Sequence, residues 1–174
     1  QGRRLFFSKK EISAWKKFRN DRIYTLTIDD YAKCFDFSLA MLYRGYTPVD
    51  WGSGRRREAG QNITNWIRGQ LGELAVQKFL KDKMGIHAEL DFELHEHIVP
   101  QDIIGIREGG KIREPKLKVA VKATKMNNCW LVLGETEVEL PSRKSDVYIL
   151  TRIALPDDHL MRISKNELEK MLKG

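Results

Sequence analysis

Three short segments of this chain carry residues whose types and order suit chemistry on a phosphodiester. Asp102 precedes an apolar run at 103–106, Lys122 lies inside a second apolar run at 117–123, and Glu73 follows Gly72 upstream. Carboxylates bind Mg²⁺ through oxygen, and the ion can activate a water and neutralise charge on a phosphate. A nearby lysine can orient that water, help to deprotonate it, or stabilise the negative charge that develops.

The spacing around Lys122 predicts a strand with two different faces. Successive strand residues point to opposite sides, so Lys122 shares one face with Ala120 and Thr124. The apolar side chains at 119, 121 and 123 share the other face. We therefore expect the apolar face to enter the core and the Lys122 face to border a cleft.

Together these segments resemble the active-site framework of the PD-(D/E)xK nucleases, the restriction-endonuclease-like superfamily. The resemblance covers roughly residues 64–153 and rests on short motifs. It implies that Asp102 and Glu73 are metal ligands, that Lys122 is the catalytic lysine, and that the cofactor is Mg²⁺, with Mn²⁺ as a substitute. It also implies a helix followed by a sheet whose second and third strands carry the site.

Ala120 departs from this pattern, because the superfamily has Asp or Glu two residues before the lysine. Alanine has no ligand atom, so Ala120 marks a catalytic position that lacks its function. We favour a disabling replacement that leaves DNA binding intact, because the rest of the strand is retained. The alternative is natural divergence, in which the site is dead or a carboxylate from another element fills the gap.

Each candidate residue also has a purely structural explanation. Asp102 could cap a turn before a strand, Lys122 could be a solvated lysine on a half-exposed strand, and Glu73 could lie on a helix surface. His95 and His97 would share a strand face, but no third metal ligand has suitable spacing.

The basic surplus favours a polyanionic partner, although similar surpluses occur in proteins that bind no nucleic acid. The net charge is +7 and the isoelectric point is about 9.4. A glycine-flanked run at 55–57 could clamp phosphates or reach guanine edges, or it could be a solvated loop. The candidate DNA-binding residues are Arg55, Arg56, Arg57, Lys111, Arg113, Lys125, Arg143 and Lys144.

Several classes of protein find no support in the sequence. Cys34 and Cys129 have no CxxC spacing, which argues against a zinc site or a disulfide framework and favours a reduced, cytoplasmic setting. The resemblance to DNA nucleases adds the expectation that the protein is nucleoid-associated. We expect no secretory leader and no membrane span, since the longest apolar stretch is too short to cross a bilayer. No phosphate-loop motif is present, so we expect no nucleotide cofactor.

The elements that must position the candidate site are helices followed by a run of strands. Apolar periodicity and end signals predict helices at 8–20, from Thr27 or Asp29 to Gly45, at 64–84 before Gly85, and at 164–172 with a Ser164–Glu167 capping box. Strands are predicted at 88–94, 103–106, 117–123, 130–133 and 147–153, with a hairpin turn at Gly109-Gly110.

This order predicts an α/β or α+β domain with a central mixed sheet flanked by helices and an N-terminal helical extension. Residues 1–60 would be an accessory region for DNA recognition or dimerisation, and residues 61–174 the nuclease core, within one compact domain.

The leading hypothesis is a metal-dependent endonuclease of the type II restriction kind, acting on double-stranded DNA as a homodimer that matches a palindromic target. The same framework also serves Holliday-junction resolvases and other repair or transposition nucleases. A non-catalytic DNA-binding module remains a separate hypothesis, and an RNA-binding or protein-interaction domain rests on the net charge alone.

Overall fold

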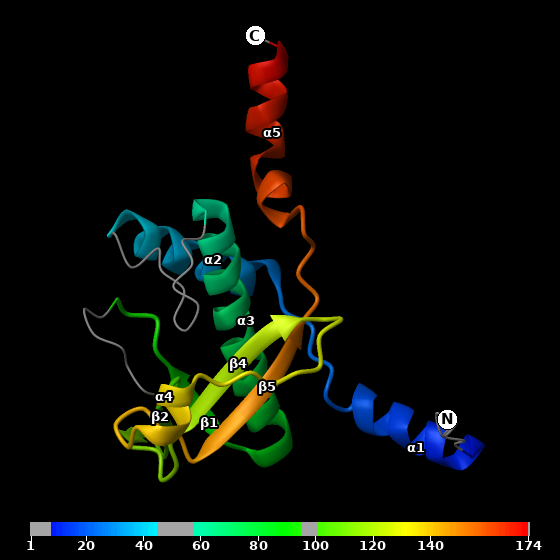
Figure 1. Cartoon of the computed structure of the whole chain (residues 1–174), viewed down its shortest axis with the longest axis vertical. Helices are drawn as coiled ribbons and strands as arrows, with labels where there is room; N and C mark the ends of the chain where they lie inside the picture. The colour runs from blue at the N-terminus through cyan, green and yellow to red at the C-terminus, as the bar shows by residue number, and fades with distance from the viewer. Residues whose placement is uncertain (1–7, 45–57, 95–100, 174) are drawn as a thin grey trace.

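The computed structural model describes residues 8–44, 58–94 and 101–173, and within these ranges the chain is a mixed α+β protein (Figure 1). Its elements in chain order are α1 (Lys9–Asn20), α2 (Ile28–Tyr43), α3 (Ala59–Met84), β1 (His87–Leu90), β2 (Ile103–Glu108), β3 (Lys111–Arg113), β4 (Val119–Lys125), α4 (Glu135–Glu139), β5 (Val147–Ile153) and α5 (His159–Lys173).

The first three predicted helices are confirmed, and local signals mark their ends. Ser8 and Glu11 form a capping box at α1, and Thr27 and Asp30 form another at α2. Gly85 ends α3 in the left-handed conformation that glycine adopts without strain. The helix α2 ends at Tyr43. Gly45, where we predicted the stop, lies outside the described residues.

The predicted start of the last helix at Ser164 is wrong. The helix α5 begins at His159, and Ser164 lies inside it with its hydroxyl donating to the Leu160 carbonyl at 3.2 Å. A serine inside a helix commonly bonds the carbonyl one turn back. The spacing that suggested a cap therefore belongs to a helix interior.

The strand predictions are confirmed in part. β5 has the predicted bounds, β2 and β4 are close to theirs, and Gly109-Gly110 turns between β2 and β3 with positive φ at both glycines. The predicted strand at 130–133 is wrong: this segment is irregular, and Trp130 is 74% exposed. An apolar run makes a strand only where a neighbouring strand can pair with it. The helix α4, which was not predicted, follows it.

Two small sheets replace the single central sheet that we expected. β1, β2 and β3 form an antiparallel sheet, while β4 and β5 pair in parallel. The two sheets meet where the Asp102 amide donates to the Val119 carbonyl at 3.1 Å. This link brings the start of β2 beside the start of β4.

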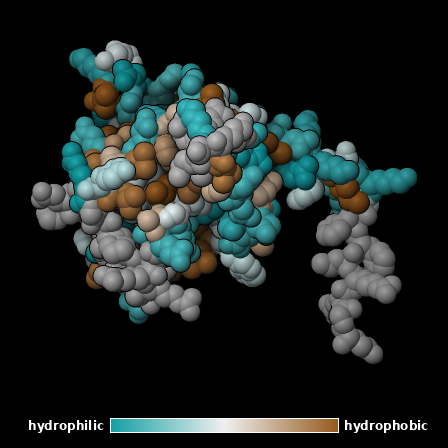
Figure 2. Space-filling view, turned by 90° about the horizontal axis from the view of Figure 1, so that it is seen from above, coloured by the Kyte–Doolittle hydropathy of each residue, from teal (hydrophilic) through white to brown (hydrophobic). Residues whose placement is uncertain are grey.

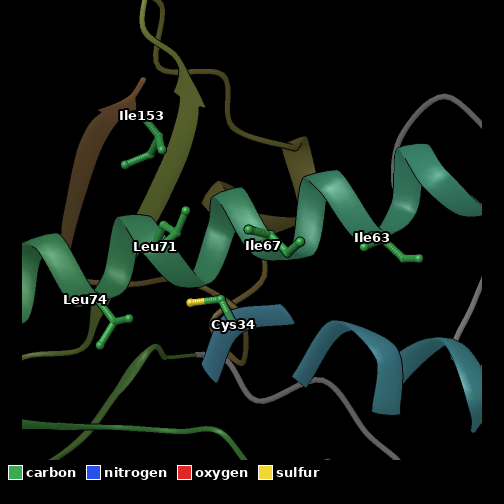
Figure 3. Packing of buried hydrophobic residues seen from close by; sticks show 6 residues of the cluster. All are labelled: Cys34, Ile63, Ile67, Leu71, Leu74 and Ile153. Carbon is green, nitrogen blue, oxygen red and sulfur yellow. The ribbon is translucent and has the colours of Figure 1, made fainter. Parts of the chain in front are cut away.

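The long helix α3 carries the main core. Figure 3 shows its apolar side chains in a row, with Cys34 reaching them from α2 and Ile153 from β5. Because α2 packs on α3, residues from both sides of the expected boundary at residue 60 share one core. The cluster consists of Cys34, Ile63, Ile67, Leu71, Leu74 and Ile153.

The helix α1 projects from the rest of the protein. None of its residues is buried, and it shows both hydrophilic and hydrophobic surface as an arm on the right of Figure 2. Arg19 covers part of the exposed Trp15 ring through a cation–π contact. No helix in the described ranges is both long enough and apolar enough to cross a membrane.

The close contact between α3 and the β4–β5 sheet depends on Gly72. A Cβ at this position would lie 2.5 Å from Thr151 Oγ1 and 2.8 Å from Ala123 Cβ. We expect Gly72→Ala to lower the free energy of unfolding by about 1–3 kcal/mol, because overpacking costs more than the gain in helix propensity.

Gly69→Ala is the matched control, since a Cβ there meets no atom within 4 Å. It is expected to raise the free energy of unfolding by roughly 0.5–1 kcal/mol through helix propensity alone. Urea unfolding measures both. Equal effects of the two substitutions would contradict the packing of α3 on β4.

Candidate functional site

Lys122 in β4 is paired with a carboxylate that was not predicted as part of the site. Its ammonium donates to Glu137 Oε1 from α4, and both side chains are about one third exposed, at 31% and 32%. The second oxygen of Glu137 accepts the Gly134 amide at 2.9 Å. Burial acts to raise the pKa of Glu137, but the hydrogen bonds from Lys122 and Gly134 hold it below its ordinary value.

Tyr148 in β5 fixes α4 beside Lys122. Its hydroxyl donates to the Glu137 carbonyl at 2.5 Å and accepts the Ser145 amide at 3.0 Å. Ala123 and Thr151 face α3 through Gly72. Strand alternation therefore places Lys122 and Tyr148 on the opposite face of the β4–β5 pair.

We expected the Lys122 face of this strand to border a cleft, and on that face Ala120 is only 6% exposed. Its strand partner in the parallel register is Tyr148, which is itself half-buried beneath α4. Lys122 and Thr124 on the same face are also half-buried. The face that carries the lysine is partly covered by the chain itself.

Asp102 has both a structural and an electrostatic role. Its Oδ2 accepts the Val121 amide at 2.5 Å, so the carboxylate ties the start of β2 to β4. Burial raises the pKa of Asp102, with a further contribution from Glu137, whereas the Val121 amide and Lys122 act to lower it. The charges of Lys122 and Glu137 thus both act on the pKa of Asp102.

Glu73 on α3 is 8% exposed, which rules out a helix-surface position. Burial raises its pKa to about 9, and the negative charges of Asp102 and Asp91 add to the shift. Gln70 Nε2 donates to its Oε1 at 3.3 Å. Glu73 is therefore protonated at neutral pH in the protein by itself.

Asp91 directly follows β1 and was not predicted as a site residue. The acidic positions that alternate with apolar ones at 88–94 were used only to predict a strand. Its effect on Glu73 shows that it faces the same region. A chain position cannot reveal this, because the two residues come together only through the packing of β1 on α3.

The donor atoms around Glu73 suit a hard cation such as Mg²⁺. Glu73 and Asp102 supply carboxylate oxygens, and Gln70 Oε1 is buried without a hydrogen-bond partner. In the described ranges no three His, Cys, Asp or Glu side chains are close enough to hold a metal ion. Mg²⁺ is often held by one or two carboxylates together with water and phosphate oxygens, so this pair fits it. His95 and His97 lie outside the described residues.

One of the predicted DNA-binding residues, Arg143, acts electrostatically on Glu137, the ion-pair partner of Lys122. Its positive charge helps to lower the pKa of Glu137, which places it beside the Lys122–Glu137 pair. Lys144 next to it is exposed.

The structure describes three of the remaining predicted DNA-binding residues, namely Lys111, Arg113 and Lys125. Lys111 is exposed on β3, and Arg113 is held by two hydrogen bonds to Glu108. Lys125 pairs with Asp157 at 3.3 Å on the surface. The arginines at 55–57 lie outside the described residues.

No family model, curated protein or solved structure matches this chain. The class that the structure defines is mixed α+β. Any functional assignment therefore rests on the residues of the site.

Proposed function

We propose that this chain is a metal-dependent DNA nuclease of the restriction-endonuclease-like kind, short of one metal ligand at Ala120. The observation that carries the proposal is the electrostatic grouping of Glu73, Asp102 and Lys122. These residues come from α3, from the start of β2 and from β4, and the fold brings them together across long stretches of sequence. Such shifted carboxyl groups beside a lysine are typical of catalytic sites.

The order of the elements supports the same proposal. A long helix precedes the strands, Asp102 stands at the start of the second strand, and Lys122 lies in the next long strand, β4. The resemblance implies a site on the second and third strands of one sheet, whereas here Asp102 and Lys122 belong to two sheets that the Asp102–Val119 hydrogen bond joins. The short hairpin strand β3 is an addition between them.

The roles of the residues follow from their chemistry. Glu73 and Asp102 would hold Mg²⁺, which when bound supplies charge stabilisation on the phosphate and an activated water. Lys122 would donate to a phosphate oxygen or orient the attacking water. Because Lys122 is paired with Glu137 in the protein by itself, that ion pair has to open before the ammonium can reach a phosphate.

Glu137 is a candidate for the carboxylate that, if Ala120 arose by natural divergence, would fill the gap left by the missing acidic residue. It is a carboxylate from another element that the fold brings to Lys122. If it turns to the metal, it replaces the missing acidic residue. If it stays on the lysine, it blocks the site, and the protein binds DNA with little or no cleavage.

The experiment that tests the proposal measures duplex DNA binding by fluorescence anisotropy, with EDTA or with Mg²⁺ at constant ionic strength. We expect salt-dependent binding that Mg²⁺ strengthens, because metal on the carboxylates would remove their repulsion of phosphate. Asp102→Asn is expected to bind more tightly in EDTA and to lose the response to Mg²⁺. Asp82→Asn, an exposed carboxylate on α3, is the matched control and should behave as the unchanged protein does.

An Mg²⁺ response that survives Asp102→Asn would count against the metal site. Absence of duplex binding at low salt would count against the whole proposal. Preference for a branched competitor over linear duplex would favour a junction resolvase within the same class. Preference for RNA would favour the RNA-binding alternative.

We further propose a homodimer, because one site per chain cuts both strands of a duplex most simply through two-fold symmetry. Light scattering of the protein with and without duplex DNA measures the number of chains. A single chain per duplex would limit the activity to nicking.

A further inference from the structure

A second polar cluster lies away from the candidate active site, where α2, α3 and the start of α5 meet. His159 is buried and is hydrogen-bonded through Nδ1 to the Tyr31 hydroxyl at 2.6 Å and through Nε2 to the Thr64 hydroxyl at 3.1 Å. The proposed nuclease chemistry uses none of these side chains. They join three helices that are distant in sequence (Figure 1).

Arg68 is the one charged group that this cluster buries in the described part of the chain. It is 8% exposed, and its Nη1 donates to Asn65 Oδ1 at 3.1 Å. Its Nε is buried without any hydrogen-bond partner. No carboxylate in the described ranges makes an ion pair with it.

Among the residues that the structure describes, none around Arg68 supplies the missing negative charge. His159 offers no negative charge, and burial together with the positive charge of Arg68 lowers its pKa from the ordinary value. Asp157 is the acidic group that acts on Arg68, but it lies on the surface and pairs there with Lys125. An arginine inside a protein normally meets a carboxylate or a phosphate, often through two parallel hydrogen bonds.

The position of Arg68 suits a ligand. One helical turn further along α3, Gly72 contacts Thr151 and Ala123 near the carboxyl ends of β4 and β5. Ligands of parallel sheets commonly bind beyond the carboxyl ends of the strands. Lys125, which ends β4, adds a second positive charge at this edge.

We propose that Arg68 is the centre of a phosphate-binding site, separate from the candidate metal site. Its Nε donates to a phosphate oxygen, and Lys125 exchanges Asp157 for the anion at the rim. A free phosphate and a phosphate of a DNA strand offer the same oxygens. The proposal goes beyond the nuclease function, because the site can bind phosphate whether or not the protein cuts DNA.

The experiment compares thermal unfolding of the full chain in inorganic phosphate and in sodium chloride of equal ionic strength. We expect phosphate to raise the midpoint of the unchanged protein and of Arg107→Met, an exposed arginine paired with Glu89 that serves as the matched control. In chloride, Arg68→Met should unfold at a higher midpoint temperature than the unchanged protein, because the variant no longer buries an unpaired charge. Phosphate should not raise the midpoint of this variant.

Arg68→Lys keeps the positive charge but removes the planar guanidinium group with its parallel N–H donors. Calorimetric titration of this variant should show at least a tenfold loss of phosphate affinity. This variant decides the question if Arg68→Met does not fold. Duplex DNA binding that weakens with Arg68→Lys and not with Arg107→Met identifies a strand phosphate, and an unchanged DNA affinity identifies a free phosphate. An unchanged phosphate response in the Arg68 variants, or none in the unchanged protein, overturns the proposal.

Discussion

Ala120→Glu protein is expected to cut duplex DNA in Mg²⁺ on the order of 100-fold faster or more than the protein with Ala120. The added carboxylate would stand two residues before Lys122 on the same strand face. It would complete the proposed set of metal ligands, and a single charged or polar group that stabilises a transition state is commonly worth about 10²–10³ in rate. Fragment patterns from a mixed genomic DNA, followed over time on gels, measure the gain.

Two further variants control for the position of the new charge and for the role of the lysine. Thr124→Glu places a carboxylate on the same face but beyond Lys122, and we expect no gain from it. Lys122→Ala in the restored protein should abolish the gain. Because Ala120 is buried, circular dichroism must first show that the Glu variant is folded.

The outcome also separates the two explanations of Ala120. Discrete fragments from the Glu variant alone would support a disabling replacement. Residual cleavage by the unchanged protein that disappears with Glu137→Gln would show that Glu137 fills the gap. No cleavage from any variant, with DNA still bound, would favour a non-catalytic DNA-binding module.

Glu73→Gln protein is expected to keep its stability as the pH rises from 5 to 9, whereas the unchanged protein loses stability over this range. The folded state holds the Glu73 proton up to a pKa of about 9, while the unfolded chain releases it near 4.5. A carboxyl group with a raised folded pKa stabilises the folded state below the unfolded pKa. That contribution is lost as the pH rises toward the folded pKa.

The slope of this loss is at most about 1.4 kcal/mol per pH unit. Glutamine has nearly the shape of protonated glutamate and does not ionise, so the variant should be more stable by on the order of a few kcal/mol above neutral pH. Urea unfolding at several pH values measures both profiles. Glu93→Gln, an exposed carboxylate, is the control and should follow the unchanged protein.

Mg²⁺ tests whether the same carboxyl group binds metal. A metal ligand has to lose its proton, so metal affinity rises with pH. At pH 8, Mg²⁺ should restore part of the stability of the unchanged protein and have little effect on Glu73→Gln. Parallel pH profiles for the two proteins would contradict the burial of an ionisable Glu73.

The elements that could be predicted are those with local signals. The capping boxes at Ser8 and Thr27 mark their helices because the cap and its partner lie three residues apart. Gly85 stops α3 and Gly109 turns the hairpin because their backbone conformations suit glycine. The strand β5 could likewise be predicted from its own seven residues, whose side chains are typical of a strand.

The wrong predictions all depended on distant neighbours. The run at 130–133 has strand-like side chains, but no strand in the described part of the chain pairs with it. Ser164 has the spacing of a cap but lies inside a helix that starts at His159. The alternation in β4 likewise does not reveal that Ala120 is buried, with Tyr148 as its strand partner in β5.

The sequence by itself determined which residues of this protein can do chemistry and most of the elements that carry them. Glu73, Asp102 and Lys122 stand out by residue type and by their place in apolar runs. Only the tertiary structure decided that Glu73 is buried and protonated, and that Glu137 meets Lys122. Burial and ion pairing are sums over neighbours that the chain brings from far away, and a local pattern of residues does not contain them.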